Sequence, residues 1–288
     1  MKKLLVLALA LAMCLSLAAC GGSASTAAPA SSAAAPASSE AAPASSEAPA
    51  EPGKQVFIQG FDLDYPPYSY RKDDGTVGGF DVEVAQAVCE YLGWEYQACP
   101  FNWDAKEAEL ASGACDCIWS GFTVEGREDD YLWSDAYSKN TQLILVPADS
   151  EIQSLADLAG KTVGVQTSTS AYDMLQDEEG QKALADTFGS LEVFETYTIA
   201  FNDLQAGGID AIAIDATAGG FLVSGKEDQF RFLEETLGVE TYAIGFRKDD
   251  AELRDAVNDA IKALSADGTI AKIAENEDYA EIREFLIV

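Results

Sequence analysis

Four polar segments of this sequence each follow an apolar run that we expect to form a strand. The segment SGFTVEGR at 120–127 places hydroxyl groups and Gly121 ahead of Arg127, whose guanidinium can pair with a carboxylate. The segment QTSTS at 166–170 can open a helix, and the first N–H groups of a helix also favour an anion. Asp215 ends the run DAIAID and can hold a cation, while DLDYPPYSY at 62–70 groups aromatic rings around a Pro-Pro turn.

Taken singly, each of these features has a purely structural explanation. Hydroxyl groups before a helix are commonly N-caps, and an aspartate at a strand end is commonly a turn former. Tyr65 and Trp103 can belong to a core, and Arg127 can pair with Glu125 or Asp129 on the surface. Taken together, a guanidinium with helix N–H groups, a carboxylate and two aromatic rings match the three parts of an α-amino acid. The combination therefore predicts a site for such a molecule.

Short β-rich runs alternate with amphipathic helices from Lys54 to Val288. One helix is expected to begin with Asp81 as its N-cap and to end before Gly93. The alternation favours an α/β architecture with mainly parallel strands, and ligands of such sheets bind beyond the carboxyl ends of the strands. The expected strands are 56–61, 95–101, 115–120, 141–147, 161–166, 191–197 and 210–215, and the expected helices are 81–92, 106–112 and 251–266.

The N-terminus has the pattern of a secretory leader followed by a tether. Lys2 and Lys3 precede an apolar run that is too short to span a bilayer. The segment LAAC followed by two glycines resembles the bacterial lipobox, so we expect residues 1–19 to be removed and Cys20 to be lipidated. An ordinary signal peptide, which would release the protein, is the alternative. Residues 20–53 contain almost only Ala, Ser, Pro, Glu and Gly and predict a disordered tether.

Composition excludes several classes of function. The leader holds two of the 18 basic residues and none of the 49 acidic ones, so the remaining chain is a poor partner for nucleic acid. The absence of histidine excludes Ser/His/Asp and Cys/His nucleophilic sites. We expect no metal, no cofactor and no catalysis. The cysteines at 89, 99, 115 and 117 allow three disulfide pairings, which the sequence does not rank.

From about Val56 to the C-terminus, the chain resembles the family 3 bacterial extracellular solute-binding proteins. These are receptors for polar amino acids that serve ABC importers. The matching segments are YPPYSY, DGTVGGFDVEVAQAV, WDAKEAELASGACDCIWSGFT, LADLAGKTVGVQTSTS and GGIDAIAID. Their shared order and spacing make the resemblance specific, whereas any one segment alone would be weak.

The resemblance implies a role for each candidate site residue. Arg127 would bind the ligand α-carboxylate with help from Thr123 and Thr169, while Asp215 and the carbonyl of Ser120 would take the α-ammonium. Tyr65 and Trp103 would sandwich the ligand side chain, and Asp62 would reach its polar tip. The complete predicted set is Asp62, Tyr65, Trp103, Ser120, Gly121, Thr123, Arg127, Ser168, Thr169 and Asp215.

Two positions depart from the family pattern. Family members commonly have five residues from the threonine to the arginine, whereas Thr123 and Arg127 are four apart. The glycine that is common before the helix start is Ser168 here. The shorter turn would shift the guanidinium and Ser168 would narrow the carboxylate site, so both departures bear on which amino acid is bound.

The implied fold is the type II periplasmic-binding-protein architecture, with two lobes and two chain crossings at a hinge. Residues 54–140 with 246–288 would form lobe 1, residues 147–239 lobe 2, and 141–146 and 240–245 the crossings. A ligand that touches both lobes would stabilise the closed form, which a membrane permease would recognise.

The predicted function is a lipid-anchored, monomeric receptor that delivers a polar amino acid to an ABC permease. It would work at the extracellular face of the membrane, or in the periplasm of an envelope with two membranes. Ligand side chains with hydrogen-bond donors, such as Gln, Arg or Lys, are favoured, and cystine or a small polar amino acid also fits. The alternatives are a prephenate-type dehydratase, with Asp62 or Glu125 as a general acid, and a ligand-sensing input protein with a partner chain.

Overall fold

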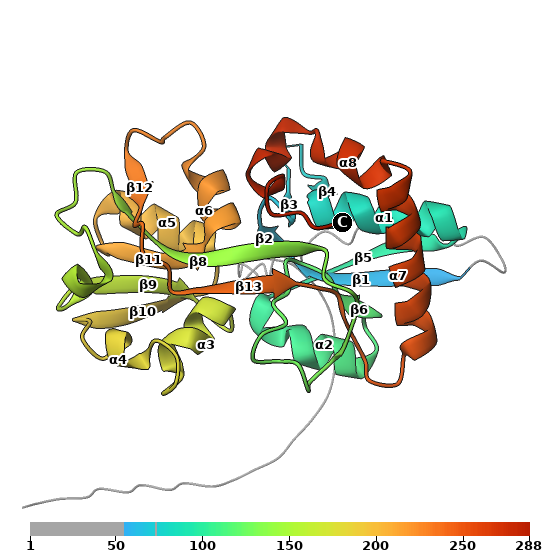
Figure 1. Ribbon diagram of the computed structural model, residues 1–288, viewed down its shortest axis with the longest axis horizontal. Helices are drawn as coiled ribbons and strands as arrows, with labels where there is room; N and C mark the ends of the chain where they lie inside the picture. Colours follow the sequence, from blue (N-terminus) through green and yellow to red (C-terminus); the bar gives the residue numbers. More distant parts are fainter. Residues whose placement is uncertain (1–54, 73) are drawn as a thin grey trace, which may run out of the picture. The chain divides into compact units, whose positions relative to one another are not determined.

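The computed structural model describes residues 55–72 and 74–288, all of which belong to the compact unit Pro49–Val288. The predicted leader, Cys20 and the tether therefore lie outside the described residues. Within this unit the α/β prediction is confirmed, because helices pack against two separate main sheets (Figure 1).

The sheet of the first lobe has the strand order β5-β1-β6-β14-β7. Its strand β1 pairs in parallel with β5 and β6, whereas β14 is antiparallel to β6 and β7. A small antiparallel sheet, β2-β3-β4, lies in the same lobe. The strands are β1 (Val56–Asp62), β2 (Asp64–Tyr65), β3 (Ser69–Arg71), β4 (Val77–Gly78), β5 (Glu95–Phe101), β6 (Cys117–Ile118), β7 (Leu132–Trp133) and β14 (Gly245–Phe246).

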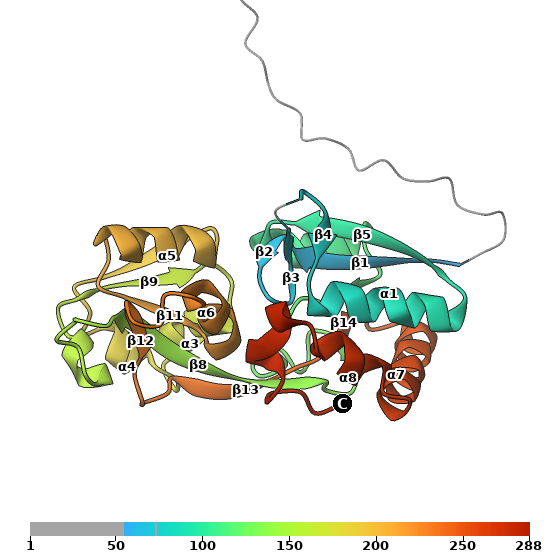
Figure 2. The ribbon, with the colours of Figure 1, turned by 90° about the horizontal axis from the view of Figure 1, so that it is seen from above.

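Helices cover this first sheet, and the elements of the C-terminus belong to it (Figure 2). Helix α1 packs on β1 and β5, and α7 packs on α1 and β7. The predicted helix 251–266 matches α7. The elements are α1 (Phe80–Leu92), the short helix η1 (Trp103–Ala105), α2 (Lys106–Ser112), α7 (Ala251–Ala266), α8 (Thr269–Ala274) and η3 (Glu277–Ile282).

The sheet of the second lobe has the order β10-β9-β11-β8-β12, and β13 also pairs with β8. Strand β9 is parallel to β10 and β11, whereas β8 is antiparallel to β11, β12 and β13. The strands are β8 (Ser138–Pro147), β9 (Thr162–Gln166), β10 (Ser190–Phe194), β11 (Ala211–Asp215), β12 (Phe230–Phe232) and β13 (Gly238–Tyr242). The helices are η2 (Leu155–Leu158), α3 (Ser170–Gln176), α4 (Lys182–Ala185), α5 (Tyr197–Ala206) and α6 (Ala216–Val223).

The chain passes between the two lobes along β8 and β13. These strands pair with each other from Ser138 and Tyr242 to Gln142 and Gly238, and both views show them side by side (Figures 1 and 2). The expectation of mainly parallel strands is wrong in part, because β8 and β13 carry the chain directly from one lobe to the other. A parallel neighbour needs a crossover helix, whereas a strand that arrives from the other sheet can pair antiparallel. The predicted boundaries of the lobes and crossings stay a prediction.

One capping prediction is wrong. The N-cap of α1 is Gly79, with φ 127, and Asp81 lies in the first turn with its side chain buried. A Cβ atom on Gly79 would lie 2.2 Å from the carbonyl oxygen of Tyr68, so only glycine fits there. The prediction at the other end is confirmed, because Gly93 ends α1 in the left-handed conformation.

Three further observations concern the described part of the chain. Cys99, Cys115 and Cys117 are free thiols. Within residues 55–72 and 74–288, no cluster of acidic, cysteine or histidine side chains is arranged to hold a metal ion. None of the helices in these ranges has the length and apolar character of a bilayer-spanning segment.

Candidate ligand-binding site

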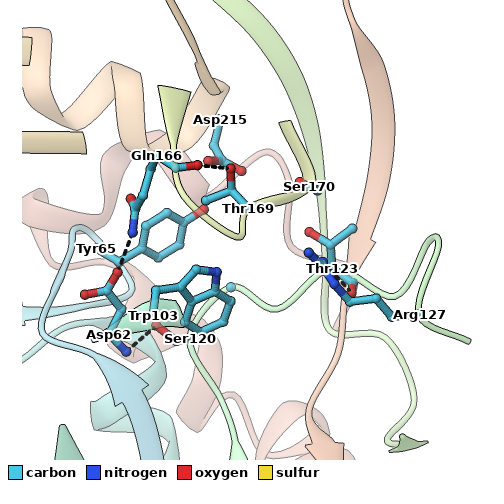
Figure 3. A pocket seen from close by; sticks show the side chains of 11 residues that line it. Asp62, Tyr65, Trp103, Ser120, Thr123, Arg127, Gln166, Thr169, Ser170 and Asp215 are labelled. Atoms are coloured by element: carbon cyan, nitrogen blue, oxygen red, sulfur yellow. Dashed lines mark hydrogen bonds between the residues drawn. The ribbon is translucent and has the colours of Figure 1, made fainter. Parts of the chain in front are cut away.

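One pocket gathers nine of the ten predicted residues and two that were not predicted. Its volume is about 20 Å³, which is room for about one water molecule. Figure 3 shows Arg127 beside Thr123, apart from the acidic side chains of Asp62 and Asp215. The lining residues are Asp62, Tyr65, Trp103, Ser120, Gly121, Thr123, Arg127, Gln166, Thr169, Ser170 and Asp215.

The loop after β6 positions Arg127. Gly121 adopts φ 53, and a Cβ atom there would lie 2.6 Å from the ring of Tyr65. The N–H of Gly121 donates to Oδ2 of buried Asp81 at 2.8 Å, which fixes the start of the loop. At the other end, Nη1 of Arg127 lies 3.5 Å from the carbonyl oxygen of Thr123, a long hydrogen bond. The guanidinium is therefore held by the loop that carries it.

Contacts from the second lobe complete the surroundings of Arg127. Its Nη2 donates to Oδ2 of Asp173 at 2.6 Å, and the Asp173 side chain is 57% exposed. Thr169 is the N-cap of α3, and its Oγ1 accepts a hydrogen bond from the N–H of Tyr172. The predicted helix start at the TSTS segment is thus present, with Thr169 and Ser170 on the pocket wall.

Ser168 is the predicted residue that does not line the pocket. It has a φ of 57, which is unusual for a residue other than glycine. Its carbonyl oxygen accepts hydrogen bonds from three side chains of the first lobe: Nε1 of Trp103 at 2.9 Å, Nζ of Lys106 at 3.3 Å and Nη2 of Arg127 at 3.4 Å. Ser168 therefore acts between the lobes through its backbone.

The buried carboxylate of Asp215 lies at the end of β11. Its Oδ1 accepts hydrogen bonds from Nδ2 of Asn140 at 2.9 Å, Nε2 of Gln142 at 2.6 Å and the hydroxyl of Tyr242 at 2.6 Å. Ser120 lies on the first lobe, where its Oγ contacts Oγ of Ser69 at 2.7 Å. Asp215 is thus fixed by donors that come from the two crossing strands.

The two predicted aromatic residues both reach the pocket, and each is nearly buried. The hydroxyl of Tyr65 lies 3.0 Å from that of Tyr242, and its ring stacks on Tyr68. The Trp103 ring packs edge-on against Phe122, and Nζ of Lys106 lies 4.9 Å from the centre of the Trp103 ring. These contacts fix both rings, which suits a rigid apolar wall.

Asp62 and Gln166 meet across the two lobes. Nε2 of Gln166 donates to Oδ2 of Asp62 at 2.8 Å (Figure 3). Oδ1 of Asp62 accepts from the N–H of Asp64 at 2.9 Å. Burial raises the pKa of Asp62 to about 6, although both hydrogen bonds oppose the rise. Gln166 was not predicted, yet it is the last residue of β9 and the strand-end rule points to it.

Comparison with known proteins places the chain in a family. Residues 57–276 match the bacterial extracellular solute-binding proteins, family 3, and the chain belongs to that family. The arginine-binding extracellular protein ArtP of Bacillus subtilis is 32% identical over 277 residues, which is 95% of this chain and 96% of that protein. The L-cystine-binding protein TcyJ of Escherichia coli is 32% identical over 231 residues, or 79% and 84% of the two chains.

Solved structures agree with the type II two-lobe fold. An ABC uptake transporter substrate-binding protein from Streptococcus pneumoniae with bound histidine has a TM-score of 0.73 and 29% sequence identity. The match covers 76% of this chain and 91% of that chain. The resemblance drawn from the five sequence segments is thereby confirmed.

Proposed function

We propose that this protein binds a polar amino acid between its lobes and delivers it to the permease of an ABC importer. The observation that carries the proposal is the pocket itself. Arg127 and the start of α3 offer a site for a carboxylate, and Asp215 offers a site for an ammonium group. Tyr65 and Trp103 would flank the side chain, and Asp62 with Gln166 would face its polar end.

Ligand entry would require the lobes to separate, because the pocket has room for only about one water molecule. The lobes touch through polar contacts that opening would break. Besides Gln166 and Asp62, Nδ2 of Asn102 donates to Glu195 at 2.9 Å and Oγ1 of Thr198 donates to Asp64 at 2.7 Å. A ligand that contacts both lobes would favour the closed form, which is hinge closure about β8 and β13.

The location and partners are part of the same proposal. Lipidation of Cys20 would anchor the protein at the extracellular face of the membrane, or in the periplasm. A monomer would meet the permease through its closed form. The related proteins whose names include arginine, cystine and histidine support a polar amino acid as cargo.

We propose that the protein binds its ligand without catalysing a reaction. One observation favours a dehydratase as the second candidate function. Asp62 is buried in the pocket, and its pKa of about 6 suits a general acid. The other acid considered, Glu125, does not line the pocket and instead accepts hydrogen bonds from the N–H and Oγ1 of Thr241. Of the two acids considered, only Asp62 lines the pocket, so Asp62 is the candidate general acid of a dehydratase.

A thermal-shift screen tests both candidates. The purified protein would be heated with each of the twenty amino acids, cystine, ornithine and prephenate. Ligand binding to the native state raises the melting temperature. At a ligand concentration of a hundred times Kd it adds about 2.7 kcal/mol to the free energy of unfolding. A shift with one or a few amino acids supports the receptor, a shift with prephenate alone supports the enzyme, and no shift at all contradicts both.

A further inference from the structure

A second buried carboxyl group lies behind Asp215. Glu240 on β13 is 3% exposed and is not part of the pocket lining. Two side-chain amides on β8 connect the two carboxyl groups. Nδ2 of Asn140 donates to Oδ1 of Asp215 at 2.9 Å and to Oε1 of Glu240 at 2.6 Å. Nε2 of Gln142 contacts the same two oxygens at 2.6 and 2.8 Å. The carboxyl groups therefore share their donors.

Two buried oxygen atoms, one of Glu240 and one of Gln142, lack a hydrogen-bond donor in the part of the chain that the structure describes. Its Oε2 and the Oε1 of Gln142 are both buried, and neither accepts a hydrogen bond from any described residue. Oδ1 of Asp215 has an additional donor in the hydroxyl of Tyr242, at 2.6 Å. A proton on Glu240 would supply an O–H donor and would avoid two negative charges in one buried cluster.

Both ionisable and uncharged side chains from the neighbouring strands and helices face Glu240. The ionisable ones are Asp215 at the end of β11, Tyr197 on α5 and Tyr242 on the strand of Glu240 itself. Burial, and then the charge of Asp215, raise the pKa of Glu240 to about 7. Strand β8 and helix α3 face Glu240 with uncharged side chains, which oppose this rise: Asn140, Gln142 and Ser170.

We propose that Glu240 is a positioning residue of the ammonium site that holds a proton in the ligand-free protein and releases it to solvent when a cation binds Asp215. The inference rests on the proposed function, because the cation is the ammonium group of the ligand. A positive charge beside the cluster favours the ionised form of Glu240. Proton release and ligand binding are then linked, so the affinity rises with pH through the range in which Glu240 titrates.

Unfolding of the ligand-free protein tests whether Glu240 holds the proton. A carboxyl group whose pKa is raised by folding destabilises the native state as the pH rises from its unfolded to its folded pKa, here from 4.5 to about 7. Across this range the unfolding constant of the wild type should rise by about 100-fold more than that of Glu240→Gln, which has no such proton to lose. Equal pH dependence of both proteins would overturn the proposal.

The matched control is Glu125→Gln. Glu125 is exposed and bonds to Thr241, the next residue of the same strand, so the control changes a carboxyl group beside β13 without touching the buried cluster. It should keep the pH dependence of the wild type. If Glu240→Gln does not fold, the proton count of the wild type decides instead.

Calorimetry in two buffers of different ionisation enthalpy counts the protons released on binding. The probes are L-arginine, L-histidine and L-cystine, used where they raise the melting temperature. We expect about half a proton per ligand near pH 7 from the wild type, with the release lost in Glu240→Gln and kept in the control Glu125→Gln. Binding without release would overturn the proposal. If none of the probes binds, the release step falls with the proposed function, whereas the unfolding experiment still reports on Glu240.

Discussion

The two charged ends of the pocket are built in different ways. At the Asp215 end, three donors on the crossing strands meet one carboxylate oxygen, and all of them are buried. At the Arg127 end, the guanidinium contacts an exposed aspartate of the other lobe and a carbonyl oxygen at 3.4 Å. The first end is fixed by the two crossing strands, whereas the second combines a long hydrogen bond within its own loop with contacts between the lobes.

This difference separates two tasks in a binding protein that closes. A preorganised carboxylate costs little reorganisation when an ammonium group arrives. A cation that has partners across the interlobe boundary instead links ligand binding to closure, because its contacts with Asp173 and Ser168 form only when the lobes meet. We therefore expect changes near Arg127 to affect closure as well as affinity, and changes near Asp215 to affect affinity and stability.

The largest expected effect is that of Arg127→Ala. Removal of one partner of a buried charged pair costs about 2–5 kcal/mol, or roughly 30- to several-thousand-fold in Kd. Titration calorimetry with the amino acid found in the screen should show no binding at micromolar concentration. Arg254→Ala removes a guanidinium that pairs with Asp255 away from the pocket, and it should bind normally. A variant at Arg127 that binds within threefold of the wild type would contradict the assigned role.

Tyr242→Phe tests the preorganised end and should have the next largest effect. It removes one of the three donors to Oδ1 of Asp215, and a hydrogen bond to a charged group contributes about 1.5–3 kcal/mol. We expect weaker ligand binding and a lower free energy of unfolding in urea. Tyr279→Phe is the control, because its hydroxyl donates to Glu83 away from the pocket. It should lower stability alone, and equal loss of affinity in both variants would contradict the comparison.

The strand-end rule found most of the pocket because the carboxyl ends of β1, β6, β9 and β11 all point to it. The rule also applies to Gln166, which is the last residue of β9 but was left out of the predicted site because it was taken as part of the strand. It gave no sign of Asn140 or Glu240. These residues meet only through the antiparallel register of β8 and β13, which pairs Asn140 with Glu240. The local patterns that locate single strands do not show which strands pair when they are about 100 residues apart, as Asn140 and Glu240 are.

The buried role of Asp81 was missed for a related reason. Its position before an apolar helical stripe favoured an N-cap, but its Oδ2 accepts from the N–H of Gly121 and from the hydroxyl of Tyr137. Both donors are distant in sequence. The local sequence pattern thus located the start of α1 to within two residues, while tertiary contacts determined the role of the Asp81 carboxyl group.

Ser168→Gly should increase stability. A non-glycine residue at positive φ costs about 1–3 kcal/mol, and the flexibility of glycine in the unfolded chain returns roughly 0.5–1 kcal/mol of that. We expect a net gain of about 1 kcal/mol in the free energy of unfolding. Ser224→Gly, where φ is −52, should instead lower stability slightly. A loss of stability at both positions would show that the backbone of Ser168 is not strained.

Asp173→Asn should have the smallest effect, and it tests most directly whether the Arg127 end of the pocket differs from the Asp215 end. Asp173 neutralises Arg127 from an exposed position, and exposed ion pairs contribute about 0–1 kcal/mol. Because the carboxylate of Asp173 competes with that of the ligand for the guanidinium, its removal should tighten binding by up to about fivefold, and less at high salt. Asp186→Asn, which breaks the exposed pair with Lys182, should leave the affinity unchanged. Weaker binding of Asp173→Asn would mean that Asp173 orients Arg127 for the ligand, and the carboxylate end would then be preorganised as well.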